Sequence, residues 1–265
     1  MKKWLIILVV CGCLAAFASG CATTPPEDPE VRQKKIEAKQ NLGVSLLRAG
    51  DNQGAIRELL QVVEMDPGNA EIHDALGLAY RNLGAYDKAI VHFNRALSLR
   101  PDFPEAQNNL GTVYLVLRQW DKAIALFESA AQNIMYRTRH YAYENLGTAY
   151  FYKRDFKRAI EYYRKAVEIL PGYSPAYDHM GLAYEAQKEW DLALQVYLKA
   201  IEYAPEFQMS RLHLGALYLR LGLQKEAADE LMKTIQIDPA SEASKEARRL
   251  LKQVRIEEKP DKDKP

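Results

Sequence analysis

The segment Asn108–Ala130, NNLGTVYLVLRQWDKAIALFESA, contains the pattern that decides the fold. Its markers are Gly111, Tyr114 three residues later, Ala123 twelve residues after the glycine, and Phe127 four residues after that. Apolar residues recur at intervals typical of helices in both halves of the segment, which predicts an amphipathic helix pair. The glycine and the alanine would let the two helices approach closely, and the tyrosine and the phenylalanine would fill the space around that contact.

The same pattern occurs six times along the chain. Its glycine follows leucine or methionine at Gly43, Gly77, Gly111, Gly147, Gly181 and Gly215, at intervals of 34, 34, 36, 34 and 34 residues. The first large residue of each unit is Leu46, Tyr80, Tyr114, Tyr150, Tyr184 or Tyr218, and the second is Leu59, Phe93, Phe127, Tyr163, Tyr197 or Leu231. The alanines are Ala55, Ala89, Ala123, Ala159, Ala193 and Ala227, and prolines close five units at Pro67, Pro101, Pro171, Pro205 and Pro239. The sixteen tyrosines are therefore interpreted mainly as packing residues.

This period and pattern resemble the tetratricopeptide repeat (TPR), whose units stack because one helix pair cannot bury its apolar face alone. The resemblance covers roughly residues 36–240 and implies an all-α fold, a right-handed TPR superhelix (α-solenoid) of six helix-turn-helix repeats plus a C-terminal capping helix. The first helix of each unit is called helix A here and the second helix B. The predicted repeats are 36–69, 70–103, 104–139, 140–173, 174–207 and 208–240, followed by the capping helix 241–256 and a disordered tail 257–265.

The third unit departs from the pattern. It lacks the closing proline, and two extra residues lie between Ala123 and Gly147. We expect a longer helix or a wider turn there, which would divide the array into two blocks of three repeats.

The N-terminus resembles a bacterial lipoprotein signal peptide, predicted for residues 1–20. Lys2 and Lys3 precede an apolar stretch that ends near Phe17 and is shorter than the roughly 20 residues that a membrane-spanning helix needs. The residues Ala18–Cys21 resemble a lipobox, in which the cysteine carries the lipid after cleavage. An uncleaved anchor with incidental cysteines is the alternative, and Cys13 is a poorer lipidation site because a shorter apolar segment precedes it.

Lipidation of Cys21 by diacylglycerol and an N-acyl chain would anchor the protein to a membrane. Ala22 follows the cysteine where retention in the inner membrane usually requires aspartate, so the resemblance implies the outer membrane, facing the periplasm. Residues 21–35 contain three prolines and several charges, which predicts a flexible tether.

Composition and motifs argue against several functional classes. A net charge of +1 disfavours a dedicated nucleic-acid binder. All three cysteines of the sequence lie within its first 21 residues, so no disulfide framework and no cysteine metal site is expected in the rest of the chain. The sequence has no glycine-rich phosphate loop and no protease or hydrolase motif, so we expect no enzyme, no cofactor and no small-molecule substrate. His179 and His213 occupy equivalent positions in adjacent repeats, but a metal site would need further ligands, so no metal is expected.

The candidate partner-binding groove is the concave face, which helix A of each unit lines in this fold. The residues predicted to line it are Gln40, Val44, Leu47, Asp74, Leu78, Arg81, Asn108, Thr112, Leu115, Asn145, Thr148 and Phe151. Such a groove suits a partner's helix or extended segment, with Asn108 and Asn145 available to its backbone. Alternatively, several of these residues pack against neighbouring repeats. Chaperone-binding TPR proteins clamp a terminal carboxylate with lysines, and Gln40, Val44 and Asn108 do not supply them.

The segment from Arg137 to Lys165 is rich in basic residues and could meet an acidic partner or lipid headgroups, or form an ordinary charged outer face. The whole architecture resembles the pilotin family of type IV pilus biogenesis, lipoproteins that help the secretin reach the outer membrane and form its multimer. This implies a non-enzymatic scaffold with a secretin subunit as partner. The main alternative is a periplasmic TPR lipoprotein adaptor for proteases or peptidoglycan hydrolases. A polysaccharide-export scaffold and an enzyme rank third and fourth.

Overall fold

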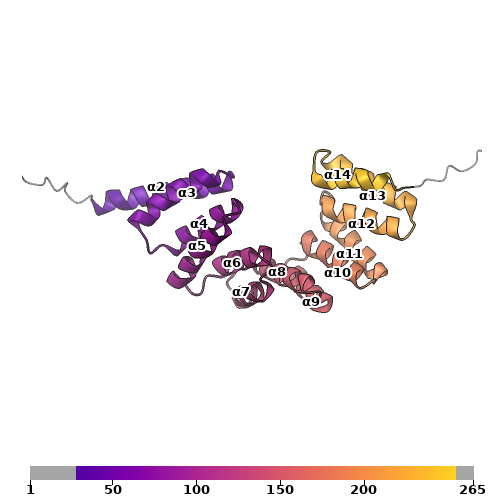
Figure 1. Ribbon diagram of the computed structural model, residues 1–265, viewed down its shortest axis with the longest axis horizontal. Coiled ribbons are helices and arrows are strands. Elements are labelled where there is room, and N and C mark those ends of the chain that lie inside the picture. Colours follow the sequence, from indigo (N-terminus) through magenta and orange to yellow (C-terminus); the bar gives the residue numbers. More distant parts are fainter. Residues whose placement is uncertain (1–27, 255–265) are drawn as a thin grey trace, which may run out of the picture.

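The computed structural model describes residues 28–254 as thirteen α-helices, without strands in that range (Figure 1). Six helix pairs follow one another and a single helix ends the array. The bounds are α2 Pro29–Arg48 and α3 Asn52–Met65, α4 Ala70–Asn82 and α5 Tyr86–Leu99, α6 Pro104–Val116 and α7 Trp120–Gln132, α8 Arg139–Tyr152 and α9 Phe156–Ile169, α10 Ser174–Ala186 and α11 Trp190–Tyr203, α12 Gln208–Arg220 and α13 Gln224–Ile237, and finally α14 Glu242–Leu251. The all-α solenoid predicted from the repeat is confirmed.

The repeat glycine sets how closely the two helices of a unit approach. A Cβ atom added to Gly77 would lie 2.5 Å from the Phe93 ring, and one added to Gly181 would lie 2.2 Å from the Tyr197 ring. Phe93 and Tyr197 are fully buried. The glycine on helix A and the large residue on helix B therefore form one contact, as the sequence pattern predicts.

The helix pairs form an open arch, with α6 to α9 at its middle (Figure 1). Successive A helices (α2, α4, α6, α8, α10 and α12) contact one another, whereas within residues 28–254 successive B helices do not. The A helices therefore lie on the inner, concave side. At the C-terminal end, Ala243 and Ala247 of α14 cover Leu212 and Leu231 of the sixth unit, as expected of a capping helix.

The predicted division into two blocks of three repeats is wrong. A wider turn does occur, because residues 133–138 separate α7 from α8, but α8 is only one residue longer than most A helices. The largest buried cluster runs through this junction, from Ala123 on α7 to Ala200 on α11. Tyr136, in the turn itself, is buried in that cluster. The extra residues thus add an aromatic side chain to a continuous core.

The flexible tether predicted for residues 21–35 is wrong for residues 29–35, which belong to helix α2. Helix α2 begins at Pro29, because the Asp28 carboxylate accepts a hydrogen bond from the Glu30 backbone N–H (2.8 Å) and proline suits the first turn. Arg32 donates to the Met65 carbonyl at the end of α3 (2.6 Å), which fixes the added turns to the first unit. Cys21, the signal peptide and the tail 257–265 lie outside the described residues. No helix in residues 28–254 combines the length and apolar character that crossing a bilayer requires.

Candidate functional site

The concave side of the arch contains an apolar hollow over the middle repeats. Its larger part has a volume of about 520 Å³ and is lined by Leu115, Val116, Arg118, Trp120, Thr148 and Tyr152. A smaller part of about 90 Å³ adjoins it and is lined by Thr148, Phe151, Tyr152, Tyr163, His179 and Leu182. Thr148 and Tyr152 of α8 belong to both parts, so the hollow extends from α6 across α8 to α10.

The hollow presents apolar side chains to solvent. Trp120 and Tyr152 stack with their ring centroids 5.1 Å apart and an interplanar angle of 14°. Tyr152 is 55% exposed and Val116, at the end of α6, is 57% exposed. Large apolar side chains grouped at a concave surface are a usual mark of a binding site. The chemistry of this lining suits apolar and aromatic side chains of another polypeptide.

Some of the residues predicted for the groove line this hollow. Leu115, Thr148 and Phe151 lie in it, together with Leu182, which occupies an inward position of helix A in unit 5. The structure adds Val116, Trp120 and Tyr152, which lie outside the inward positions of helix A on which the prediction was based. The aromatic residues at the end of helix A and the start of helix B were the available signal.

The predicted groove residues of the first two units lie elsewhere on the concave face. Leu47 packs against the core of the first unit, and Leu78 packs against the core around Phe93. Gln40 and Val44 are half-buried on α2. Arg81 donates to the Thr112 hydroxyl (3.2 Å), so both side chains serve the junction between units 2 and 3. The alternative that several groove residues pack against neighbouring repeats describes this part of the face.

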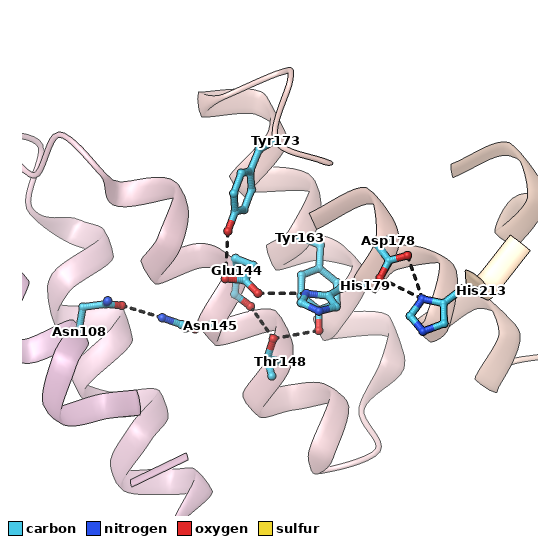
Figure 2. A network of polar contacts seen from close by, with 9 residues as sticks. All are labelled: Asn108, Glu144, Asn145, Thr148, Tyr163, Tyr173, Asp178, His179 and His213. Atoms are coloured by element: carbon cyan, nitrogen blue, oxygen red, sulfur yellow. Dashed lines mark hydrogen bonds and ion pairs between the residues drawn. The ribbon is translucent and has the colours of Figure 1, made fainter. Parts of the chain in front are cut away.

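A ladder of polar side-chain contacts joins successive A helices. An acceptor on one unit meets a donor one position further along on the next unit. The four rungs are Asp74 with Asn109 (3.0 Å), Asn108 with Asn145 (2.9 Å), Glu144 with His179 (3.0 Å) and Asp178 with His213 (2.9 Å). Figure 2 shows the last three rungs.

The ladder corrects the role predicted for Asn108 and Asn145. The Asn145 amide donates to the Asn108 carbonyl oxygen, and Asn108 is buried. These amides therefore bond to each other across the repeat junction instead of being available to a partner's backbone. Breaking such a pair would leave a buried polar group unsatisfied, which typically costs about 1–3 kcal/mol. They are junction residues.

Glu144 occupies the centre of the polar network beside the hollow (Figure 2). Its carboxylate contacts His179 Nδ1 (3.0 Å) and accepts from the Tyr173 hydroxyl (3.4 Å). Burial opposes the charge on His179, but the contact with Glu144 and the charges of Glu144 and Asp178 outweigh it and raise the pKa of His179. Burial, together with the charge of Glu144, also raises the pKa of Tyr173. The network thus favours a protonated His179 and neutral tyrosines.

The two histidines of the ladder are not arranged as a metal site. His179 and His213 each pair with the carboxylate of the preceding unit, Glu144 and Asp178 respectively. Among residues 28–254, no group of three or more histidine, cysteine, aspartate or glutamate side chains is placed to hold a metal ion. Their equivalent positions in the repeat therefore reflect the ladder.

The comparisons with known proteins agree with this architecture. Three family models match the chain, one described as TPR repeat over residues 77–116 and two described as tetratricopeptide repeat over residues 102–172 and 180–242. A search of curated proteins finds no significant match.

Solved structures extend the likeness over most of the chain. PilF of Pseudomonas aeruginosa is 21% identical, with 83% of this chain and 99% of that chain covered and a TM-score of 0.69. PilW, a widely conserved type IV pilus biogenesis factor, is 22% identical, with 79% and 96% covered and a TM-score of 0.72. MamA is 31% identical, with 66% and 94% covered and a TM-score of 0.55. The first two likenesses show a shared fold.

Proposed function

Because the chain belongs to the tetratricopeptide-repeat family, we propose that it is a non-enzymatic scaffold whose hollow holds a segment of a partner protein. The observation that carries this proposal is the hollow itself. Val116 and Tyr152 are more than half exposed, and Trp120 stacks on Tyr152. These side chains line the larger part of the hollow, whose volume is about 520 Å³. Burying such side chains against a partner contributes about 25 cal/mol per Å² of apolar surface.

The more specific proposal is that of a pilotin-like lipoprotein that assists outer-membrane localisation and multimerisation of the type IV pilus secretin. It is supported by the lipobox that ends in Cys21, by the six repeats, and by the structural likeness to the pilus biogenesis factor PilW. In this proposal Cys21 carries diacylglycerol and an N-acyl chain, and the hollow engages a secretin subunit at the periplasmic side of the outer membrane.

The secretin itself provides the test. Deleting the gene should abolish the heat-resistant secretin multimer in unheated membrane fractions on a denaturing gel, with secretin monomer still made. An unchanged multimer would reject the secretin role. The search would then turn to proteases and peptidoglycan hydrolases recovered by crosslinking, the partners of the alternative adaptor function.

A matched pair of variants tests the hollow. Val116→Lys combined with Tyr152→Lys places two charges in it, whereas Val91→Lys places one on α5, where the side chain is 65% exposed and outside the hollow. All three side chains are largely exposed, so helix content measured by circular dichroism should be retained. We expect the double variant to lose the multimer and Val91→Lys to keep it. A normal multimer in the double variant would remove the hollow from the mechanism.

The lipid anchor has its own test. Cys21→Ala removes the thiol that would carry the acyl chains, so incorporation of labelled palmitate into the protein should be lost. Cys13→Ala is the matched control and should keep the label. If Cys21→Ala is still labelled, the lipoprotein assignment fails, whichever partner the hollow binds.

A further inference from the structure

The turns between helix A and helix B have one backbone conformation in all six units. Each turn has one residue with positive φ, seven positions after the repeat glycine. These residues are Gly50 (83°), Gly84 (73°), Arg118 (58°), Arg154 (63°), Lys188 (63°) and Gly222 (80°). Units 1, 2 and 6 therefore use glycine, and units 3, 4 and 5 use a basic residue.

The hydrogen bonds of these turns are equivalent. The Gly84 N–H donates to the Arg81 carbonyl (2.9 Å), and the Arg154 N–H donates to the Phe151 carbonyl in the same way (2.9 Å). This is the Schellman helix end, for which glycine is the usual residue because it has no Cβ atom. The left-handed conformation costs other residues roughly 1–2 kcal/mol each. Three consecutive repeats thus carry a conformational cost that the other three avoid.

We call Arg118, Arg154 and Lys188 the basic rim. All three are exposed, and within residues 28–254 none has a carboxylate within ion-pair distance. The nearby carboxylates Asp121 and Asp155 pair with other cations, Lys153 (2.5 Å) and Arg158 (2.5 Å). Glu189 follows Lys188 directly and is the acidic residue that offsets part of the charge. The rim charges are therefore available to an external anion.

Two residues of the basic rim line depressions in the surface, and one of these depressions is the hollow. Arg118 lines its larger part, beside Trp120 and Tyr152. Arg154 follows Tyr152 by two residues and lines a further depression of about 460 Å³. That depression also contains Gln187, which precedes Lys188, so it connects the A–B turns of units 4 and 5. Units 3 to 5 thus combine the apolar hollow with one cation at each A–B turn.

We infer that the basic rim binds the carboxylates of an acidic segment of the partner protein whose apolar side chains enter the hollow. This rests on the proposed protein-binding role. The positive charge of the rim indicates that the partner segment is acidic. The stacked Trp120–Tyr152 pair and the apolar hollow indicate that the segment also carries apolar side chains. A flat lipid surface would contact the rim but would not fill a hollow on the inner side of the arch, so a polypeptide is the favoured occupant.

A selection experiment tests this without assuming the secretin. A random display library of peptides of about 12 residues is selected on the purified full chain in detergent, and an enriched peptide is then measured for affinity at low and high salt. We expect enrichment of Asp and Glu together with Leu, Phe or Trp. The triple variant Arg118→Asn, Arg154→Asn, Lys188→Asn should weaken the peptide about tenfold at low salt, with little difference at high salt. Asparagine is chosen because it tolerates positive φ.

The matched control replaces three exposed cations outside the rim, as Arg137→Asn, Arg164→Asn and Lys252→Asn, and should leave the affinity unchanged. Equal weakening in both triple variants, or a selection without acidic enrichment, would overturn the inference. Binding to phosphatidylglycerol vesicles that only the rim variant loses, with peptide affinity unchanged, would assign the rim to lipid instead. Loss of the secretin role leaves all these outcomes unaffected, so the two proposals fail separately.

Discussion

Units 3 to 5 differ from units 1, 2 and 6 although one repeat pattern specifies all six. The middle units have basic residues at the left-handed turn position, the exposed Tyr152 at the hollow, and the largest buried cluster. The outer units have glycine at the same turn position. The repeat therefore fixes the backbone of every unit, whereas the features of the proposed binding site lie where individual units depart from the pattern.

The largest effect is expected from the repeat glycines. Gly181→Ala would place a Cβ atom 2.2 Å from the fully buried Tyr197 ring, whereas Gly43→Ala would meet the flexible end of Leu59 at 2.7 Å. Overpacking typically costs about 1–3 kcal/mol, so Gly181→Ala should approach or exceed the upper end and Gly43→Ala the lower end. Chemical unfolding followed by circular dichroism measures both.

Gly68→Ala is the control for this pair, because its nearest neighbour would be Asp66 Oδ1 at 3.6 Å and its φ is not positive. It should change the free energy of unfolding by less than about 1 kcal/mol. Equal losses for Gly181→Ala and Gly43→Ala would mean that aromatic partners, found in units 2 to 5, and leucine partners, found in units 1 and 6, leave the same room.

The acidic ends of the ladder should respond differently to amide substitution. Burial, its largest cause, raises the pKa of Asp74 to about 6, despite the hydrogen bond from Asn109. The folded state therefore favours protonated Asp74, and stability is lost as pH rises from the unfolded pKa of 3.8 to the folded value of about 6, above which the loss is complete. Asp74→Asn should raise the free energy of unfolding by about 2 kcal/mol near pH 7.5 and by about half of that near pH 5.

Asp178 occupies the equivalent position in unit 5 but pairs with His213. Asp178→Asn is therefore expected to give no stabilisation near pH 7.5. If both substitutions stabilised the protein equally, the partner on the next repeat would not matter, and the contrast between an amide rung and a histidine rung would be wrong.

The histidines should give the two regions opposite pH dependence. His73 and His92 of unit 2 lie with their Nδ1 atoms 3.1 Å apart, and burial lowers the pKa of both. Their contribution is present above the unfolded pKa of about 6.5 and is lost as pH falls. His179 has a raised pKa, so its contribution is present below about pH 6.5 and is lost as pH rises through the folded value.

Hydrogen exchange resolved by helix separates these responses. Between about pH 7.5 and 5.5, after correction for intrinsic exchange, α4 and α5 should lose protection, while α10, which carries His179, should lose none. His73→Gln with His92→Gln should remove the effect in α4 and α5. The same loss of protection in α10 would contradict the raised pKa of His179.

The smallest effect concerns the turns themselves. Arg154→Gly relieves the left-handed strain but increases the entropy of the unfolded chain, so a net gain of about 0.5 kcal/mol is expected. Gly84→Arg makes the reverse change in unit 2, where a Cβ atom would meet nothing within 4 Å, and should cost about 1 kcal/mol. Opposite signs in thermal unfolding are the result to look for. A stability loss in Arg154→Gly would mean that the arginine contributes contacts within its own chain.

The sequence predicted some of the residues that line the hollow and missed others. Leu115, Thr148 and Phe151 were identified from their inward positions and line the hollow. Val116 and Tyr152 were not identified, because each follows an inward position by one residue. Their exposure at the hollow depends on how the repeats pack. The rim residues carry a sequence signal, because glycine occupies the same repeat position at Gly50, Gly84 and Gly222. That signal is a departure from the pattern, which a search for matches overlooks.

The helix pairs, their order and the contact between each repeat glycine and its large partner follow from the sequence alone. These features depend on residues within one 34-residue unit, where helix period and side-chain volume leave little choice. The tertiary structure decided which side chains meet between units, such as Asn108 with Asn145 and Glu144 with His179, and where the hollow lies. Those contacts depend on the rotation from one unit to the next, which is set by the packing of complete helices and not by any local pattern.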